Sequence, residues 1–149
     1  MSKEDSFQEK TLSSTYIYQG KIINLRQDKV KLPDGRETIR EIVEHPGAVV
    51  ILALTDDKKI VMIRQFRKPA DEVLRELPAG TVETGEDLFS CARRELEEET
   101  GYYPSKIKKL ITFFSTPGFC NERLTLFLAE GLEKRNKNED ADEFIKVEL

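Results

Sequence analysis

The sequence predicts an α+β protein arranged as an α/β/α sandwich, and two observations indicate this class. Short apolar runs separated by glycine, proline and charged residues recur along the chain, as is typical of strands. One internal segment, residues 84–101, carries the signals of a helix. Many strands with one dominant helix favour a layered sheet-and-helix fold. The length of 149 residues suits a single domain with its own core.

The first third of the chain predicts an antiparallel hairpin. Residues 1–14 are polar and are expected to be mobile, at least in part, and residues 16–18 suit a short strand. Residues 22–31 alternate partly between apolar and polar, and residues 38–44 return in the same manner. The turn between them, at 32–35, contains proline and glycine, which favour the dihedral angles of a tight turn.

A run of apolar residues follows this hairpin. Residues 48–54 (AVVILAL) are nearly all apolar, which predicts a strand buried on both faces. His45, the only histidine, precedes it in a turn, where a structural role is commoner than a chemical one. Further strands are expected at 60–66, 107–114, 124–129 and 144–149, whereas residues 71–76 suit an irregular segment and 133–143 a charged loop.

The helix is expected to begin and end at recognisable residues. Thr84 can cap its first turn, and Asp87 three residues later can return the hydrogen bond, as in a capping box. Gly101 is suited to end it, because glycine adopts the left-handed conformation at little cost.

Three carboxylates share one side of this helix. A helix turns about 100° per residue, so Glu95, Glu98 and Glu99 fall within an arc of about 100°, while Glu97 points the opposite way. Neighbouring like charges repel, and a divalent cation removes that cost. Mg²⁺ and Mn²⁺ prefer such oxygen ligands. The alternative is a solvated acidic helix with intrahelical arginine–glutamate pairs.

Residues 80–102 fit a spaced pattern of Gly-x5-Glu-x7-Arg-Glu-U-x-Glu-Glu-x-Gly-U, where U is a bulky apolar residue. The matches are Gly80, Glu86, Arg94, Glu95, Leu96, Glu98, Glu99, Gly101 and Tyr102. This pattern resembles the signature of the Nudix hydrolases, which is known as the Nudix box. Residues 80–102 are called the box below. The resemblance implies a mixed sheet packed between helices and Mg²⁺- or Mn²⁺-dependent hydrolysis of a nucleoside diphosphate linked to another group. It implies metal ligation by Glu95, Glu98, Glu99 and the Ala79 carbonyl, with Arg94 orienting the carboxylates.

The resemblance extends to the ADP-ribose pyrophosphatase group within that family. Pro117 stands about 15 residues after the box, Arg40 and Glu41 precede the first buried strand, and Arg67 ends the motif Gln-x-Arg. The group implies cleavage of ADP-ribose to AMP and ribose 5-phosphate. The substrate contacts that it implies are Arg40 and Glu41 near adenine, Arg67 on phosphate, Pro117 and Gly118 in the substrate loop, and Glu122 on the terminal ribose. It implies a general base on a late loop, for which Glu143 fits best and Glu139 is the alternative.

Other functions stay open at this stage. The same machinery could act on other nucleotide sugars or dinucleotides, or the chain could bind a nucleotide without cleaving it. The resemblance implies a homodimer, with residues 1–44 as the dimerisation segment and 45–149 as the catalytic domain. Relatives normally continue into a C-terminal helix after the last strand. The sequence ending at Leu149 is therefore expected to be either a naturally short form or one from which the C-terminal part is missing.

Composition narrows the partners and the compartment. A net charge of −4 argues against nucleic acid, and no apolar run approaches the roughly 20 residues of a membrane span. The N-terminus lacks the apolar core of a secretory signal, and Cys91 and Cys120 form no paired motif. We therefore expect reduced thiols and a cytoplasmic protein, while the resemblance implies a small-molecule nucleotide substrate.

Overall fold

The computed structural model describes residues 7–136 and 144–149. The chain divides into two compact units. The first comprises Met1–Pro46 and Phe114–Glu122, and the second comprises Gly47–Phe113 and Arg123–Leu149. The first unit therefore takes in a late loop in addition to the N-terminal strands.

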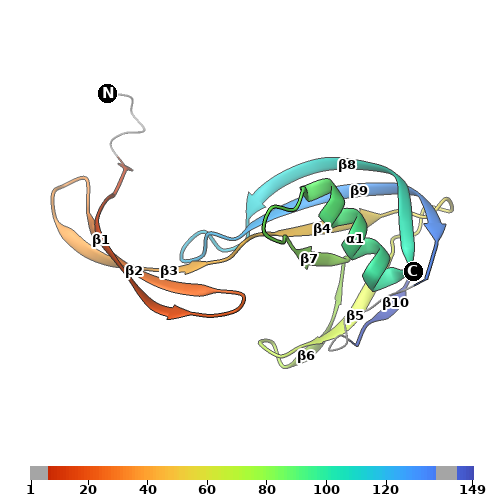
Figure 1. Ribbon diagram of the computed structural model, residues 1–149, viewed down its shortest axis with the longest axis horizontal. Helices are drawn as coiled ribbons and strands as arrows, with labels where there is room; N and C mark the ends of the chain where they lie inside the picture. Colours follow the sequence, from red (N-terminus) through yellow and green to blue (C-terminus); the bar gives the residue numbers. More distant parts are fainter. Residues whose placement is uncertain (1–6, 137–143) are drawn as a thin grey trace. The chain divides into compact units, whose positions relative to one another are not determined.

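The first unit is built on a three-stranded antiparallel sheet. Its strands are β1 (Lys10–Gln19), β2 (Asn24–Lys31) and β3 (Glu37–Glu44), in the order β1-β2-β3 (Figure 1). The β2–β3 hairpin is confirmed, with a turn in which Gly35 has a φ of 90° and donates its N–H to Leu32 O. The expected mobility does not apply to residues 10–14, because the serine- and threonine-rich β1 begins at Lys10 and pairs along β2.

A buried charge network ties β2 to its neighbours. Asp28 is only 2% exposed, and Arg26 donates to both of its carboxylate oxygens, with Nε–Oδ1 at 2.9 Å and Nη2–Oδ2 at 3.1 Å. Arg26 Nη1 also pairs with Glu44 on β3. A hydrogen bond from Ser14 on β1 and the adjacent Arg26 guanidinium lower the pKa of Asp28 below its ordinary value of 3.8. Asp28 thus joins β1 to β2, and Arg26 extends the network to β3 through Glu44.

We expect Asp28→Asn to lower the free energy of unfolding at pH 7 by about 1–3 kcal/mol, because hydrogen bonds to a charged group are lost in a buried setting. The native pKa lies below the unfolded one, so this stabilisation is complete above the unfolded pKa. It is lost as the pH falls from about 3.8 through the lower native pKa. Urea unfolding of both proteins between pH 7 and pH 3 tests this, and a difference that does not shrink with acid would contradict it.

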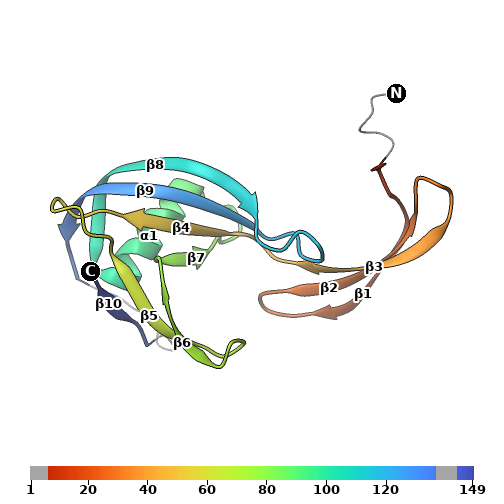
Figure 2. The ribbon, with the colours of Figure 1, turned by 180° about the vertical axis from the view of Figure 1, so that it is seen from behind.

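The second unit contains a four-stranded mixed sheet with one helix against it. The order is β7 (Ala79–Thr81), β4 (Ala48–Ala53), β9 (Arg123–Lys134) and β8 (Tyr102–Phe114). The β4–β9 pair is parallel and the β4–β7 pair antiparallel. Helix α1 (Leu88–Thr100) lies against one face of this sheet (Figure 1), and the view from behind brings the strands in front of it (Figure 2). The α+β class is therefore confirmed.

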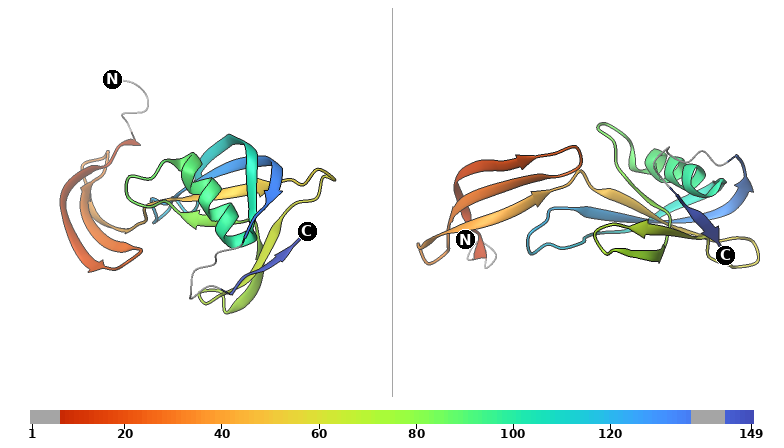
Figure 3. Two further views of the ribbon diagram at one scale, coloured as in Figure 1. Left: turned by 45° about the vertical axis from the view of Figure 1, so that its right-hand side comes forward. Right: turned by 90° about the horizontal axis from the view of Figure 1, so that it is seen from below.

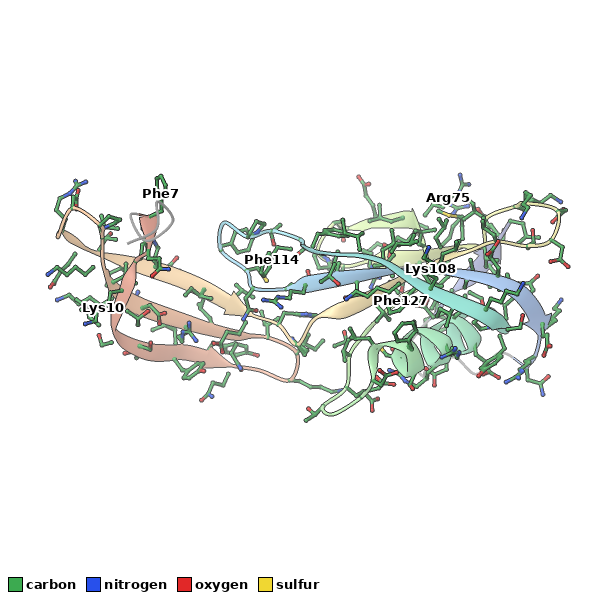
Figure 4. The ribbon with its side chains drawn as sticks, turned by 90° about the horizontal axis from the view of Figure 1, so that it is seen from above. Phe7, Lys10, Arg75, Lys108, Phe114 and Phe127 are labelled. Atoms are coloured by element: carbon green, nitrogen blue, oxygen red, sulfur yellow. The ribbon has the colours of Figure 1, made fainter. Side chains whose placement is uncertain are left out.

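The core lies between α1 and this sheet. Val49, Ile51 and Ala53 of β4 have no exposed surface, whereas the residues between them are half-buried. The expected full burial on both faces of this strand is thus wrong. Within the described residues, α1 packs against the face of β4 that carries Val49, Ile51 and Ala53, and the opposite face is only partly covered. Phe127 projects from β9 toward α1 (Figure 4), where its ring meets that of Phe89 edge-on at 5.0 Å between centroids.

A second, three-stranded sheet completes this unit. It has the order β10 (Lys146–Glu148), β5 (Met62–Arg67) and β6 (Glu72–Glu76), all antiparallel (Figure 3). The irregular segment expected at 71–76 is wrong, because β6 is a polar edge strand that pairs with β5 and carries little apolar pattern. No helix within residues 7–136 and 144–149 is long and apolar enough to cross a membrane.

Candidate active site

Helix α1 begins later than its expected cap. Asp87 is the N-cap residue, and its Oδ2 accepts from the N–H groups of Phe89 and Ser90, each at 3.1 Å. The cap expected at Thr84 is wrong, because that residue lies in a preceding turn closed by Glu86 N and Glu83 O. The expected end is confirmed, since Gly101 is left-handed with a φ of 71°. An aspartate cap typically stabilises a helix by about 1 kcal/mol.

Two of the box carboxylates are directed toward β7. Glu99 is 2% exposed, and its Oε2 accepts from the N–H of Ala79 at 3.0 Å. The Glu95 carboxylate lies against Gly80, where a Cβ atom would come within 1.9 Å of Glu95 Cδ. Only glycine leaves room for this carboxylate, so Gly80 acts through the space it provides.

The backbone of Ala79 points toward the same side. Ile51 N donates to Pro78 O at 2.8 Å and Val82 N donates to Gly47 O at 3.1 Å, which are hydrogen-bonded positions of the β4–β7 ladder. Because such positions alternate in an antiparallel pair, Ala79 opposite Val50 is a non-hydrogen-bonded position. Its N–H and C=O therefore face away from β4, and the N–H meets Glu99.

Arg94 forms ion pairs with three glutamates of the box, namely Glu86, Glu95 and Glu98. It binds Glu86 through two parallel hydrogen bonds of 2.9 Å, from Nε to Oε1 and from Nη2 to Oε2. Its Nη1 lies 2.7 Å from Glu95 Oε1 and 3.0 Å from Glu98 Oε2. The bonds from Arg94 lower the pKa of Glu86 to about 2, and the Glu86 partner raises the pKa of Arg94. Both groups therefore stay charged at neutral pH.

Cys91 lies beside this cluster, but its thiol is unreactive. Its side chain is fully buried, and its Sγ is 3.6 Å from Arg94 Nη2 and 3.7 Å from Thr81 O. Burial, with a further contribution from the Glu86 carboxylate, raises the pKa of the thiol to about 12. A thiol with this pKa is protonated at neutral pH, so Cys91 is a core residue and no nucleophile.

The outer side of α1 borders a cleft of about 720 Å³. Glu97 lies on this side, where it pairs with Arg135 at 3.4 Å. The Arg135 guanidinium in turn stacks 3.7 Å above the ring of Tyr103. The cleft is lined by Ser90, Arg93, Arg94, Glu97, Glu98, Tyr103, Pro104 and Ser105. Glu98 and Arg94 thus adjoin a space open to a ligand.

The donor set of α1 and β7 fits a hard divalent cation. Three carboxylates at the same end of α1 and the outward-facing carbonyl of Ala79 supply only oxygen ligands. Within the described residues, however, no three histidine, cysteine or acidic side chains are close enough to one another to hold an ion. The reason is that Arg94 Nη1 lies between Glu95 and Glu98, while Glu99 bonds to Ala79.

The other expected site residues are distributed over both units. In the second unit, Arg67 pairs with Glu76 at 2.7 Å across β5 and β6. In the first unit, Arg40 forms a two-pronged pair with Glu9, and Glu41 lies on β3. Pro117, Gly118 and Glu122 belong to the loop of the first unit. Glu143 and Glu139 lie outside the described residues.

Glu122 has partners that sequence reasoning missed. Its Oε2 accepts from Ser115 Oγ at 2.6 Å, and its Oε1 lies 3.4 Å from Nδ1 of His45. The sequence favours a structural role for His45 in a turn over a chemical one. The only feature of the sequence that could have indicated a role for His45 is its position directly after β3. Its proximity to Ser115 and Glu122 could not be predicted, because that depends on how the loop folds.

The fold and the box together define the class of protein. A model of the NUDIX domain matches residues 44–149, and a model of the nucleoside diphosphate sugar hydrolase N-terminal domain matches residues 9–43. The chain belongs to the Nudix family. It shares its fold with a solved structure described as an ADP compounds hydrolase, at a TM-score of 0.83 and 19% identity, over 94% of this chain and 76% of that one.

Two relatives are similar over nearly the whole chain. One is the ADP-ribose pyrophosphatase of Bacillus subtilis (strain 168), which is 47% identical over 144 residues, covering 95% of this chain and 78% of the relative. The other is the methanol dehydrogenase activator of Bacillus methanolicus, 46% identical over 143 residues, covering 95% of this chain and 77% of the relative. The chain therefore spans about three quarters of the length of each.

Proposed function

We propose that this protein hydrolyses the pyrophosphate bond of ADP-ribose to AMP and ribose 5-phosphate with a divalent metal ion. The observation that carries the proposal is the gathering of Glu95 and Glu98 around Arg94, with Glu99 on the Ala79 amide of β7. The 47% identical relative named ADP-ribose pyrophosphatase supports the choice of substrate.

The residues of α1 and β7 have different roles in the proposed site. Glu95, Glu98, Glu99 and the Ala79 carbonyl would hold Mg²⁺ or Mn²⁺, and such an ion would supply positive charge at the phosphates and activate water for hydrolysis. Arg94 orients the carboxylates, and Glu86 holds Arg94 by its two hydrogen bonds. Gly80 leaves space for Glu95. The catalytic side chains are thus fixed by contacts among themselves and with the sheet.

Recognition of the substrate falls to other side chains. Arg67 binds phosphate, for which a guanidinium offers paired donors. Arg40 and Glu41 contact the adenine end, Pro117 and Gly118 shape the substrate loop, and Glu122 accepts from the hydroxyl groups of the terminal ribose. The general base is assigned to Glu143, with Glu139 as the alternative.

Hydrolysis of ADP-ribose by the purified chain tests the proposal. We expect AMP and ribose 5-phosphate in the presence of Mg²⁺ or Mn²⁺, and no product once EDTA removes the ion. A panel of other nucleotide sugars and dinucleotides is assayed in parallel. Faster cleavage of another substrate would keep the machinery and replace the substrate assignment. Nucleotide binding without any cleavage would instead identify a non-catalytic Nudix domain.

We also propose that the protein is a cytoplasmic homodimer formed through its N-terminal strands. Large apolar side chains of the first unit are exposed, namely Tyr16, Ile17, Tyr18, Ile22 and Ile39. Covering them by a second copy would remove this apolar surface from water. Sedimentation of the full chain and of a variant lacking residues 1–44 is expected to give a dimer and a monomer; a variant that remains dimeric would contradict the assignment.

A further inference from the structure

The loop of the first unit is fastened to the end of β3 by its backbone. Val43 N donates to Phe119 O at 2.8 Å, and Asn121 N donates to Val43 O at 3.1 Å. The N–H of His45 donates to Oδ1 of Asn121 at 2.9 Å. These bonds fix the main chain just before Glu122 and bring the imidazole of His45 to its carboxylate.

The carboxylate of Glu122 is then held at both oxygens. Ser115 Oγ donates to Oε2 at 2.6 Å, and Ser115 N donates to the Glu122 carbonyl at 3.2 Å. His45 Nδ1 lies 3.4 Å from Oε1, and the side chains of His45 and Glu122 are only 14% and 25% exposed. A glutamate has three side-chain dihedrals, so two anchors on its terminal oxygens select one rotamer.

This arrangement leaves acceptor capacity on each oxygen. An ionised carboxylate offers about four acceptor sites, of which Ser115 and His45 take one on each oxygen. The remaining positions suit two adjacent hydroxyl groups, as in the diol of a pentose. Without the anchors, the side chain would have to be ordered on binding, at a cost in conformational entropy.

We infer that Ser115 and His45 are positioning residues that fix the Glu122 carboxylate for the ribose hydroxyls of the substrate. The inference rests on the proposed function and adds to it two residues that contact no reacting atom. They act on substrate binding, so their loss raises KM and leaves kcat nearly unchanged.

The variants Ser115→Ala and His45→Phe test the two anchors separately. Each is expected to raise KM for ADP-ribose roughly tenfold, as loss of one hydrogen bond to a charged group does, with kcat changed less than about twofold. Inhibition by ribose 5-phosphate should weaken in step with KM, while inhibition by AMP stays the same. His45→Asn is expected to restore KM to within about twofold, since its amide can donate from the place of Nδ1.

A double-mutant cycle with Glu122→Ala separates positioning from a general structural role. Once the carboxylate is gone, adding Ser115→Ala or His45→Phe is expected to change KM by less than about twofold. Effects that persist in the Glu122→Ala background, or single variants with the KM of the wild type, would overturn the inference alone. A folded wild type that cleaves no ADP-ribose would overturn the proposed function, and this inference with it.

Discussion

Replacing Glu99 with glutamine is expected to lower kcat by about a thousandfold, equivalent to ~4 kcal/mol of transition-state stabilisation. Glutamine has nearly the same shape but no negative charge, so a cation loses one anionic ligand at a site that already lies in a largely buried setting. The fold should survive, because the amide oxygen can still accept from the N–H of Ala79. We expect the free energy of unfolding to change by no more than about 1 kcal/mol.

The matched control is Glu97→Gln, which makes the same chemical change two residues earlier on α1. Glu97 lies on the outer side of the helix, where its pair with Arg135 is partly exposed and contributes little. Turnover by this variant should stay within about twofold of the wild type. Titration with Mn²⁺ by calorimetry gives a readout without turnover, and an unchanged affinity in Glu99→Gln would remove Glu99 from the set of metal ligands.

The helix and its carboxylates could be predicted because helical geometry is local. A rotation of about 100° per residue is sufficient to place Glu95, Glu98 and Glu99 on one side and Glu97 on the other. The structure bears this out, with Glu97 on Arg135 and Glu99 on Ala79. The left-handed Gly101 was predictable for the same reason, since a helix end is determined by a few neighbouring residues.

The strands were harder to predict where they form by hydrogen bonding to a neighbouring strand and show no apolar pattern of their own. β6 and the short β7 carry weak patterns, and each exists because β5 or β4 supplies a partner for its backbone. Likewise, β9 continues to Lys134, well past its apolar run, alongside β8. Pairing between distant segments depends on the whole topology, which the periodicity of one segment does not report.

Contacts across long sequence separations were missed for a similar reason. The bond from Ala79 N to Glu99 joins residues 20 positions apart, and Ser115 and His45 reach Glu122 from two directions. The spaced pattern includes Gly80 but does not report which contact requires glycine there. The structure gives a specific cause instead, because the side chain of Glu95 fills the space beside its α-carbon.

Gly80→Ala is therefore expected to disrupt the site from a residue that carries no chemistry. The new Cβ would lie 1.9 Å from Glu95 Cδ and 2.2 Å from both carboxylate oxygens. Gly80 is held in the β4–β7 ladder opposite Val49, so the Glu95 side chain has to move, and it leaves Arg94 Nη1. A displacement of this size typically lowers turnover about a hundredfold, whereas the free energy of unfolding falls by only about 1 kcal/mol, because the colliding atoms end a flexible side chain. Steady-state kinetics and urea unfolding measure the two effects.

The double variant Gly80→Ala/Glu95→Ala shows whether the collision is the cause. Removing the Glu95 side chain eliminates the clash, so the double variant should recover the unfolding free energy of Glu95→Ala while its turnover stays low. Gly85→Ala is the contrasting control, because its φ of 81° penalises a side chain although no atom lies within 4 Å of the added Cβ. Its stability loss should not be rescued by Glu95→Ala. Full activity in Gly80→Ala would show that catalysis does not depend on the position of the Glu95 carboxylate beside β7.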